Sequence, residues 1–174
     1  YARRKGSRGE GIVAFGPSSS SPHHQNGNRK LKKRDIVLID MGMKYKGYCS
    51  DMTRTFFLGK PTTQQENVYQ KVLDAQLAGI AQIKAGAKAA SVDKAARKSM
   101  GEDEKYFGHS FGHGIGLDVH ESPNLSSKSK DILKENMIVT AEPGIYLPGK
   151  FGVRIEDMGR VTKTGYENFT KIVK

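Results

Sequence analysis

Two neighbouring segments, Asp35-Ile-Val-Leu-Ile-Asp-Met-Gly42 and Gly47-Tyr-Cys-Ser-Asp-Met-Thr-Arg-Thr55, have the composition of paired β-strands that carry acidic side chains. In a hairpin with an even-numbered loop, residues separated by an odd number lie opposite each other, with their side chains on one face of the sheet. Asp40 and Asp51 are separated by eleven positions, so we expect them to stand directly opposite each other. Two carboxylates so placed repel each other unless a cation lies between them.

Three further ionisable residues lie in apolar or glycine-rich segments: His113, Glu142 and Glu156. A charged side chain in an apolar strand is costly to bury unless it is paired or bound to a metal, and Glu is almost never fully buried alone. Together with the two aspartates, they make a set of four carboxylates and one imidazole. This is the ligand chemistry of two divalent ions about 3.5–4 Å apart.

Composition narrows the possible classes of protein. A length of 174 residues favours one domain, spanning 1–174. The single cysteine, Cys49, excludes an intramolecular disulfide and favours a reducing, cytoplasmic environment. The sequence contains no apolar run long enough to cross a bilayer and no secretory signal, so we expect no membrane partner. The net charge of +11 comes from short basic clusters at 2–5, 28–34 and 128–130 without aromatic stacking motifs, so we expect solvated basic faces and no nucleic-acid partner.

The order of elements follows from turn and periodicity signals. A polar, basic lead-in at 1–10 precedes a strand at 11–15 and a loop at 16–22. Strands are expected at 35–40 and 48–58, with a turn at 41–46 between them. A capping box at Thr63 and Glu66 predicts a helix through about residue 84 that Gly86 ends, and a second helix is expected at 91–100. Further strands are expected at 137–141 and 153–161.

The histidine segment is not a zinc-protease helix. Glycines at 108, 112, 114 and 116 keep this part of the chain out of a helix. His109 and His113 are therefore not a helical i,i+4 pair of the kind that binds a single zinc ion.

Five segments carry a resemblance to a known family. Besides the two strand segments quoted above, they are His109-Ser-Phe-Gly-His-Gly-Ile-Gly-Leu-Asp-Val-His-Glu121, Glu142-Pro-Gly-Ile-Tyr146 and Gly152-Val-Arg-Ile-Glu-Asp157. In this order they resemble the pita-bread (M24) metallopeptidases, and within them the Xaa-Pro peptidases, aminopeptidase P and prolidase. The resemblance runs from about residue 11 to the C-terminus. It implies an α+β fold, in which a curved antiparallel sheet backed by helices holds a dinuclear metal site at its centre.

The resemblance also implies how the ligands are shared. In the resembling enzymes Asp40 chelates one ion, His113 and Glu142 hold the other, and Asp51 and Glu156 bridge both. Manganese is the expected ion for these oxygen-rich ligands, with cobalt, zinc and iron as alternatives.

Further roles come from the same resemblance. The catalytic residues would be Glu142, as general base, and His120, as a stabiliser of the oxyanion. The remaining matched positions are substrate-binding residues His23, His109 and Arg154, and orienting residues Tyr146 and Thr53. His23 rather than His24 is expected to act, because it follows Pro22 as in the family.

The implied activity is hydrolysis of the bond between an N-terminal residue and proline, so the expected partner is a peptide with proline in second position. Three alternatives remain: an Xaa-Pro dipeptidase, a methionine aminopeptidase, and a non-catalytic pita-bread binding module. The segment 152–157 and the turn at 146–148 resemble the proline-specific branch, and all five ligands are kept. One departure is Arg34, which stands where relatives usually have glycine.

The start of the chain carries a separate expectation. The sequence begins at Tyr1 rather than Met, and the resembling domains have at least one more helix before this point. We therefore expect an N-terminal truncation that leaves apolar sheet surface uncovered and promotes association into homo-oligomers.

Overall fold

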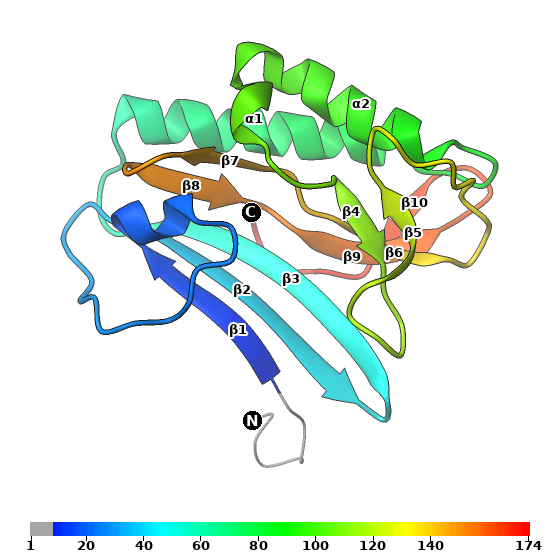
Figure 1. The fold of residues 1–174 in the computed structure, drawn as a ribbon, viewed down its shortest axis with the longest axis horizontal. Helices are drawn as coiled ribbons and strands as arrows, with labels where there is room; N and C mark the ends of the chain where they lie inside the picture. Colours follow the sequence, from blue (N-terminus) through cyan, green and yellow to red (C-terminus); the bar gives the residue numbers. More distant parts are fainter. Residues whose placement is uncertain (1–8) are drawn as a thin grey trace.

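The computed structural model describes residues 9–174, and its N-terminal part is a three-stranded antiparallel sheet (Figure 1). Its strands, in spatial order, are β1 (Gly9–Phe15), β2 (Ile36–Tyr45) and β3 (Tyr48–Phe57). A short 3₁₀ helix, η2 (Gly16–Ser20), follows β1. Residues 1–8 of the expected basic lead-in lie outside the described residues, and the strand already includes residues 9 and 10. Arg34 has a φ of 69°, a conformation that glycine adopts without strain.

The β2–β3 hairpin places both aspartates on one face, as predicted, but not directly opposite each other. Its loop is only Lys46 and Gly47, both with positive φ (49° and 89°), which is the backbone of a tight two-residue hairpin turn. Tyr45 therefore pairs with Tyr48, Asp40 with Thr53, and Asp51 with Gly42. The predicted turn at 41–46 was too long. The two carboxylates are diagonal neighbours, offset by two residues along the strands.

The C-terminal half forms a five-stranded antiparallel sheet and a separate hairpin. The sheet has the order β10 (Tyr166–Asn168), β9 (Asp157–Val161), β6 (Ile138–Ala141), β4 (Gly112–Gly114), β5 (Glu121–Leu125), and the hairpin is β7 (Gly144–Leu147) with β8 (Phe151–Arg154). The predicted strand 153–161 is therefore broken at Ile155 and Glu156. The break occurs because the amide of Glu156 donates to the carbonyl of Thr53 in β3 (3.0 Å).

Two helices, α1 (Thr63–Ile80) and α2 (Ala89–Met100), lie side by side over the C-terminal half (Figure 1). A 3₁₀ helix, η3 (Gly101–Tyr106), follows α2. The capping box of α1 uses Thr62 and Gln65, one residue before the predicted pair, and the helix ends at Ile80 rather than near residue 84. The apolar sides of the helices pack on the sheets to form a core that includes Val72, Val92, Phe111, Leu125, Val139 and Ile155.

The two halves are joined where β3 runs beside the β8–β9 segment. The Thr55 hydroxyl donates to the carbonyl of Arg154 (2.9 Å). Arg54 is buried, donates to the carbonyl of Glu156 (2.6 Å), and forms an ion pair with Asp157 (2.7 Å). This junction brings β3, which carries Asp51, against the segment that carries Glu156. The arrangement of antiparallel sheets and covering helices is the α+β architecture that we predicted.

Within residues 9–174, every helix is too short or too polar to cross a membrane.

Candidate metal centre

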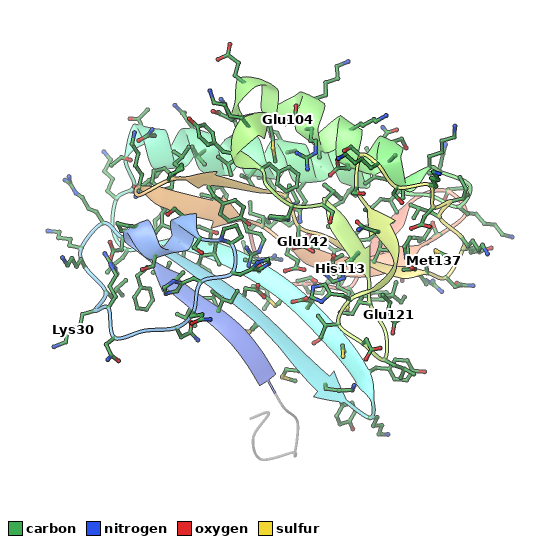
Figure 2. The ribbon with its side chains drawn as sticks, viewed as in Figure 1. Lys30, Glu104, His113, Glu121, Met137 and Glu142 are labelled. Atoms are coloured by element: carbon green, nitrogen blue, oxygen red, sulfur yellow. The ribbon has the colours of Figure 1, made fainter. Side chains whose placement is uncertain are left out.

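A cleft of about 920 Å³ opens between the two halves, and the five predicted ligands all line it. Figure 2 shows His113 and Glu142 in the middle of the molecule, between the three-stranded sheet and the helix-covered half. The ligands come from five separate parts of the chain: Asp40 from β2, Asp51 from β3, His113 from β4, Glu142 from the β6–β7 connection and Glu156 from the break between β8 and β9.

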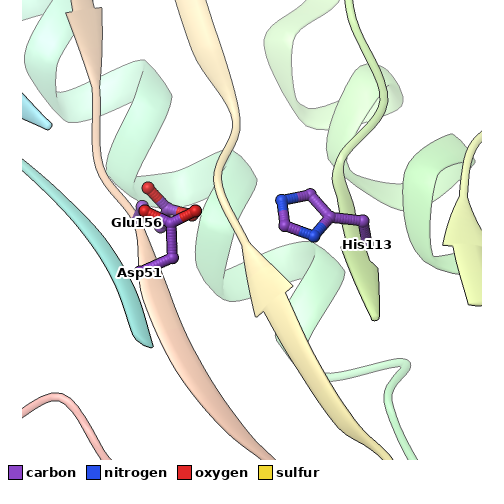
Figure 3. Close-up of side chains that lie close together, drawn as sticks. All are labelled: Asp51, His113 and Glu156. Carbon is purple, nitrogen blue, oxygen red and sulfur yellow. The ribbon is translucent and has the colours of Figure 1, made fainter. Parts of the chain in front are cut away.

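Three of these residues form a compact group. Asp51, His113 and Glu156 each offer a ligand atom within 4.8 Å of the other two. Figure 3 shows the two carboxylates close together, with the imidazole ring of His113 directed toward them. A group of this size matches the spacing of atoms around a shared cation.

His113 and Glu142 complete the cluster on one side. Nδ1 of His113 lies 3.0 Å from the carbonyl of Gly114, which can only accept, so Nδ1 carries a proton, and Nε2 is the ring nitrogen that can bind a cation once it is deprotonated. That Nε2 lies 3.1 Å from Oε1 of Glu142. Thr140 fixes both residues: its hydroxyl accepts from the amide of His113 (3.0 Å) and donates to Oε1 of Glu142 (3.1 Å). Held in this way, the deprotonated Nε2 of His113 and Oε1 of Glu142 suit a common cation.

Glu156 is buried with half of its carboxylate satisfied. The hydroxyl of Thr53 donates to Oε2 (2.7 Å). Within residues 9–174, Oε1 is buried and has no hydrogen-bond partner. Burial raises the pKa of Glu156 well above its ordinary value, and the neighbouring carboxylates of Glu142, Asp51 and Asp40 raise it further. An orphaned buried carboxylate oxygen calls for an explanation, and an ion is one.

The shifted pKa values of the clustered side chains also indicate a cation site. Burial, together with the charges of Asp40 and Glu142, raises the pKa of Asp51 to about 7. Burial alone would raise the pKa of Glu142, but its hydrogen bond with His113 and the charge of that ring outweigh burial and lower the pKa. Burial alone would lower the pKa of His113, but its hydrogen bond with Glu142 and the charge of that carboxylate raise the pKa. Hard oxygen donors crowded in this way fit a hard divalent cation, which would compensate their charge.

Arg154 orders the residues behind the cluster. Its Nη2 lies 2.5 Å from Oδ2 of Asp40, its Nε donates to the hydroxyl of Thr53 (3.0 Å), and its Nη1 donates to Tyr146 (2.8 Å) and to the carbonyl of Pro22 (3.3 Å). These contacts occupy all three guanidinium nitrogens. The buried side chain is therefore placed to orient Asp40 directly and Glu156 through Thr53.

The predicted histidines lie along the same cleft. His109 accepts from Tyr146 at Nε2 (2.8 Å) and donates from Nδ1 to the carbonyl of Ser110 (2.9 Å), and burial lowers its pKa. His120 is exposed, its ring lies 4.3 Å from that of His113, and burial followed by the charge of His113 lowers its pKa. His23 lines the cleft, whereas its neighbour His24 does not.

Sequence reasoning missed Thr140, the residue that links His113 to Glu142. A signal for it existed in the strand pattern, because positions 140 and 142 are two residues apart and project from the same face of an extended chain. Nothing in the sequence distinguishes this threonine from the others before its contacts are known.

Comparison with known proteins supports this picture. The profile described as "Metallopeptidase family M24" matches residues 1–163. The uncharacterized peptidase YqhT of Bacillus subtilis (strain 168) is 48% identical over 164 residues, which is 91% of this chain and 46% of that protein.

Solved structures agree in fold. The Xaa-Pro dipeptidase from Bacillus anthracis superposes with a TM-score of 0.93 at 45% identity, covering 97% of this chain and 48% of that one. The X-Pro aminopeptidase from Thermotoga maritima MSB8 superposes with a TM-score of 0.91 at 39% identity, covering 94% and 47%. The predicted pita-bread fold is thus confirmed. The chain spans about half the length of the relatives it matches.

Proposed function

This chain belongs to metallopeptidase family M24, and we propose that it hydrolyses the bond between an N-terminal residue and a following proline, as an Xaa-Pro aminopeptidase. The observation that carries the proposal is the orphaned Oε1 of Glu156 beside Asp51 and His113, in a cleft that also holds three histidines and Arg154. The similar solved structures include an Xaa-Pro dipeptidase and an X-Pro aminopeptidase, which supports proline in the second position.

We propose that the five ligands hold two divalent ions, with manganese expected. Asp51 and Glu156 are central to the cluster and would bridge, Asp40 lies on the Arg154 side, and His113 and Glu142 lie on the other. A divalent ion at such a place polarises a carbonyl group and makes water more acidic.

Each remaining side chain has a defined proton or contact to offer. The lowered pKa of Glu142 keeps it ionised at neutral pH, so it can accept a proton from the attacking water. His120 has a lowered pKa and is therefore neutral near pH 7, with one ring N–H available to donate to a developing oxyanion. His23 and His109 lie in the cleft where a proline ring could pack. An X-Pro amide lacks an N–H, so the site needs no acceptor for one.

The test is a matched peptide panel with chain reconstituted in Mn²⁺. We expect Ala-Pro-Ala-Ala to lose its first residue, and Ala-Ala-Ala-Ala and Met-Ala-Ala-Ala to remain intact. Cleavage of the dipeptide Ala-Pro alone would identify a dipeptidase, and cleavage of the Met peptide a methionine aminopeptidase. Metal content is measured by mass spectrometry on the same samples. It distinguishes a chain that holds metal but cleaves none of these peptides from a binding module that holds no ion.

The panel needs a variant that keeps shape but loses charge. Glu156→Gln preserves the volume of the side chain and its contact with Thr53 while weakening the proposed bridge. Activity that survives in Glu156→Gln at full rate would contradict the proposed site.

A further inference from the structure

A buried ion pair on α2 lies outside the cleft. Asp93 and Arg97 are one helical turn apart, and Nε of Arg97 lies 2.7 Å from Oδ2 of Asp93. The side chain of Asp93 is 0% exposed and that of Arg97 is 19% exposed. Neither residue lines the cleft. A buried ion pair often adds little net stability compared with apolar residues of similar volume. The role of this pair therefore has to be sought in its other contacts.

Both members of the pair hold the backbone of the segment 107–111, which carries His109. Nη1 of Arg97 donates to the carbonyl of Phe107 (3.0 Å), and Nη2 donates to the carbonyl of His109 (2.6 Å). Oδ1 of Asp93 accepts from the amide of Phe111 (3.0 Å). The guanidinium also stacks on the ring of Phe107, 4.4 Å from its centroid. Alternate residues of an irregular segment are thus tied to one helix.

The position of the His109 ring depends on this segment. The ring lies edge-on to Phe107, with centroids 4.8 Å apart, and its Nε2 reaches the hydroxyl of Tyr146 at 2.8 Å. With Nδ1 donating to the carbonyl of Ser110, the ring is held in one tautomer and one orientation. A rotation of the His109 peptide would break the contact with Arg97 and turn the ring away from Tyr146.

We propose that Asp93 and Arg97 are positioning residues that hold His109 in place for substrate from outside the cleft. The inference rests on the proposed function, in which His109 contacts the proline-containing substrate. The guanidinium is required because it joins a carboxylate and two carbonyls through three nitrogens in a fixed plane. A lysine ammonium keeps the charge but cannot reproduce that planar fork.

The first test needs no turnover. Ring ¹⁵N signals of the five histidines are recorded by NMR on the metal-free chain, and His109 is assigned from the spectrum of His109→Gln. In the parent chain we expect His109 as the Nδ1–H tautomer, and in Arg97→Lys an averaged pair of tautomers. The control is Arg160→Ala, which removes an arginine from the half-exposed pair with Glu167. Unchanged His109 signals in Arg97→Lys would overturn the proposal.

The second test separates positioning from general destabilisation. In Arg97→Lys we expect kcat/KM for Ala-Pro-Ala-Ala to fall about tenfold, because a small displacement of a substrate-contacting group is costly. Mn²⁺ stoichiometry should stay at the parent value. Loss of metal in parallel with activity would show a structural role and overturn the assignment. A parent chain without X-Pro activity would refute the proposed function, while the NMR result would still decide whether Arg97 positions His109.

Discussion

The hydroxyl of Thr53 donates a 2.7 Å hydrogen bond to Oε2 of Glu156, a residue 103 positions later in the chain. Because that bond uses the only proton of the hydroxyl, its oxygen acts as an acceptor toward Nε of Arg154 (3.0 Å). The bond occupies one carboxylate oxygen, and among the described residues the other, Oε1, is buried without a hydrogen-bond partner. Thr53 thereby links the N-terminal sheet to the residue that we propose as a bridge between two ions.

We expect Thr53→Val to weaken Mn²⁺ binding by about 10–100-fold, the usual effect of removing a hydrogen bond that orients a ligand. Valine has nearly the same shape but leaves Glu156 free to rotate and Nε of Arg154 without its acceptor. Calorimetric titration with Mn²⁺ measures the affinity. Thr164→Val, at an exposed position, is the matched control. Equal affinity in both variants would refute the orienting role.

Asp51→Ala should lose both ions, because the proposed bridge contributes to each. Parent chain reconstituted with Mn²⁺ should hold about two ions per chain, which mass spectrometry measures directly. Asp118→Ala is a suitable control, since Asp118 also lines the cleft but is exposed and lies outside the compact group of ligand atoms. Full stoichiometry in Asp51→Ala would show that the ligand assignment is wrong.

The metal-free chain should lose stability as the pH rises through the titration of Asp51. Its pKa is raised from 3.8 to about 7 by burial and by Asp40 and Glu142, so between these values the folded chain binds the proton more tightly than the unfolded chain. The free energy of unfolding therefore falls with rising pH across this window. The lowered pKa values of His109 and His120 act in the opposite direction below pH 6.5.

A comparison with Asp51→Asn isolates this group, because the histidines are common to both chains. We expect the parent chain to lose more stability than Asp51→Asn when urea unfolding is measured at pH 5 and at pH 8 without metal. Saturating Mn²⁺ should remove the difference in slope by replacing the proton. Identical pH profiles in the two metal-free chains would contradict the raised pKa.

His120→Ala should lower kcat roughly 10²–10³-fold while metal content holds, as expected for a donor that acts in the transition state. His120 is exposed at the cleft and is not one of the compact group of ligand atoms. His24→Ala is the control, because His24 lies next to the cleft histidine His23 without lining the cleft. A His120→Ala chain that keeps its rate but loses metal would make His120 a ligand instead.

The sequence predicted the strands and helices of this fold more accurately than the register and end positions that determine which residues pair. The predicted face shared by Asp40 and Asp51 was correct because alternation along a strand is local. Their exact register was wrong, because it depends on a turn at Lys46 and Gly47, and lysine rarely adopts positive φ. The capping box slipped by one residue for a similar reason: Thr62 and Thr63 both have a partner three positions later, Gln65 and Glu66.

The long-range contacts of the site could not be predicted from periodicity. The break at Glu156 exists because its amide pairs with Thr53 on another sheet, and the sequence around it reads as one continuous strand. The contacts of Arg97 with the segment 107–111 have the same character, since they join a helix to a loop through backbone carbonyls that every residue possesses.

The outer face of the three-stranded sheet should drive self-association of this chain. The strand register places a set of exposed apolar side chains on the face opposite Asp40 and Asp51: Val13, Met41, Met43, Tyr45, Tyr48 and Phe56. Helices α1 and α2 cover the other half of the molecule (Figure 1). An exposed apolar patch of this kind favours contact with a second copy.

We expect the double variant Met43→Lys/Tyr48→Lys to sediment as a smaller species than the parent chain at equal concentration. Leu77→Lys, which removes an exposed apolar residue from α1, is the control and should leave sedimentation unchanged. A parent chain that sediments as a monomer at all concentrations would refute the prediction, because the double variant would then have no association to relieve.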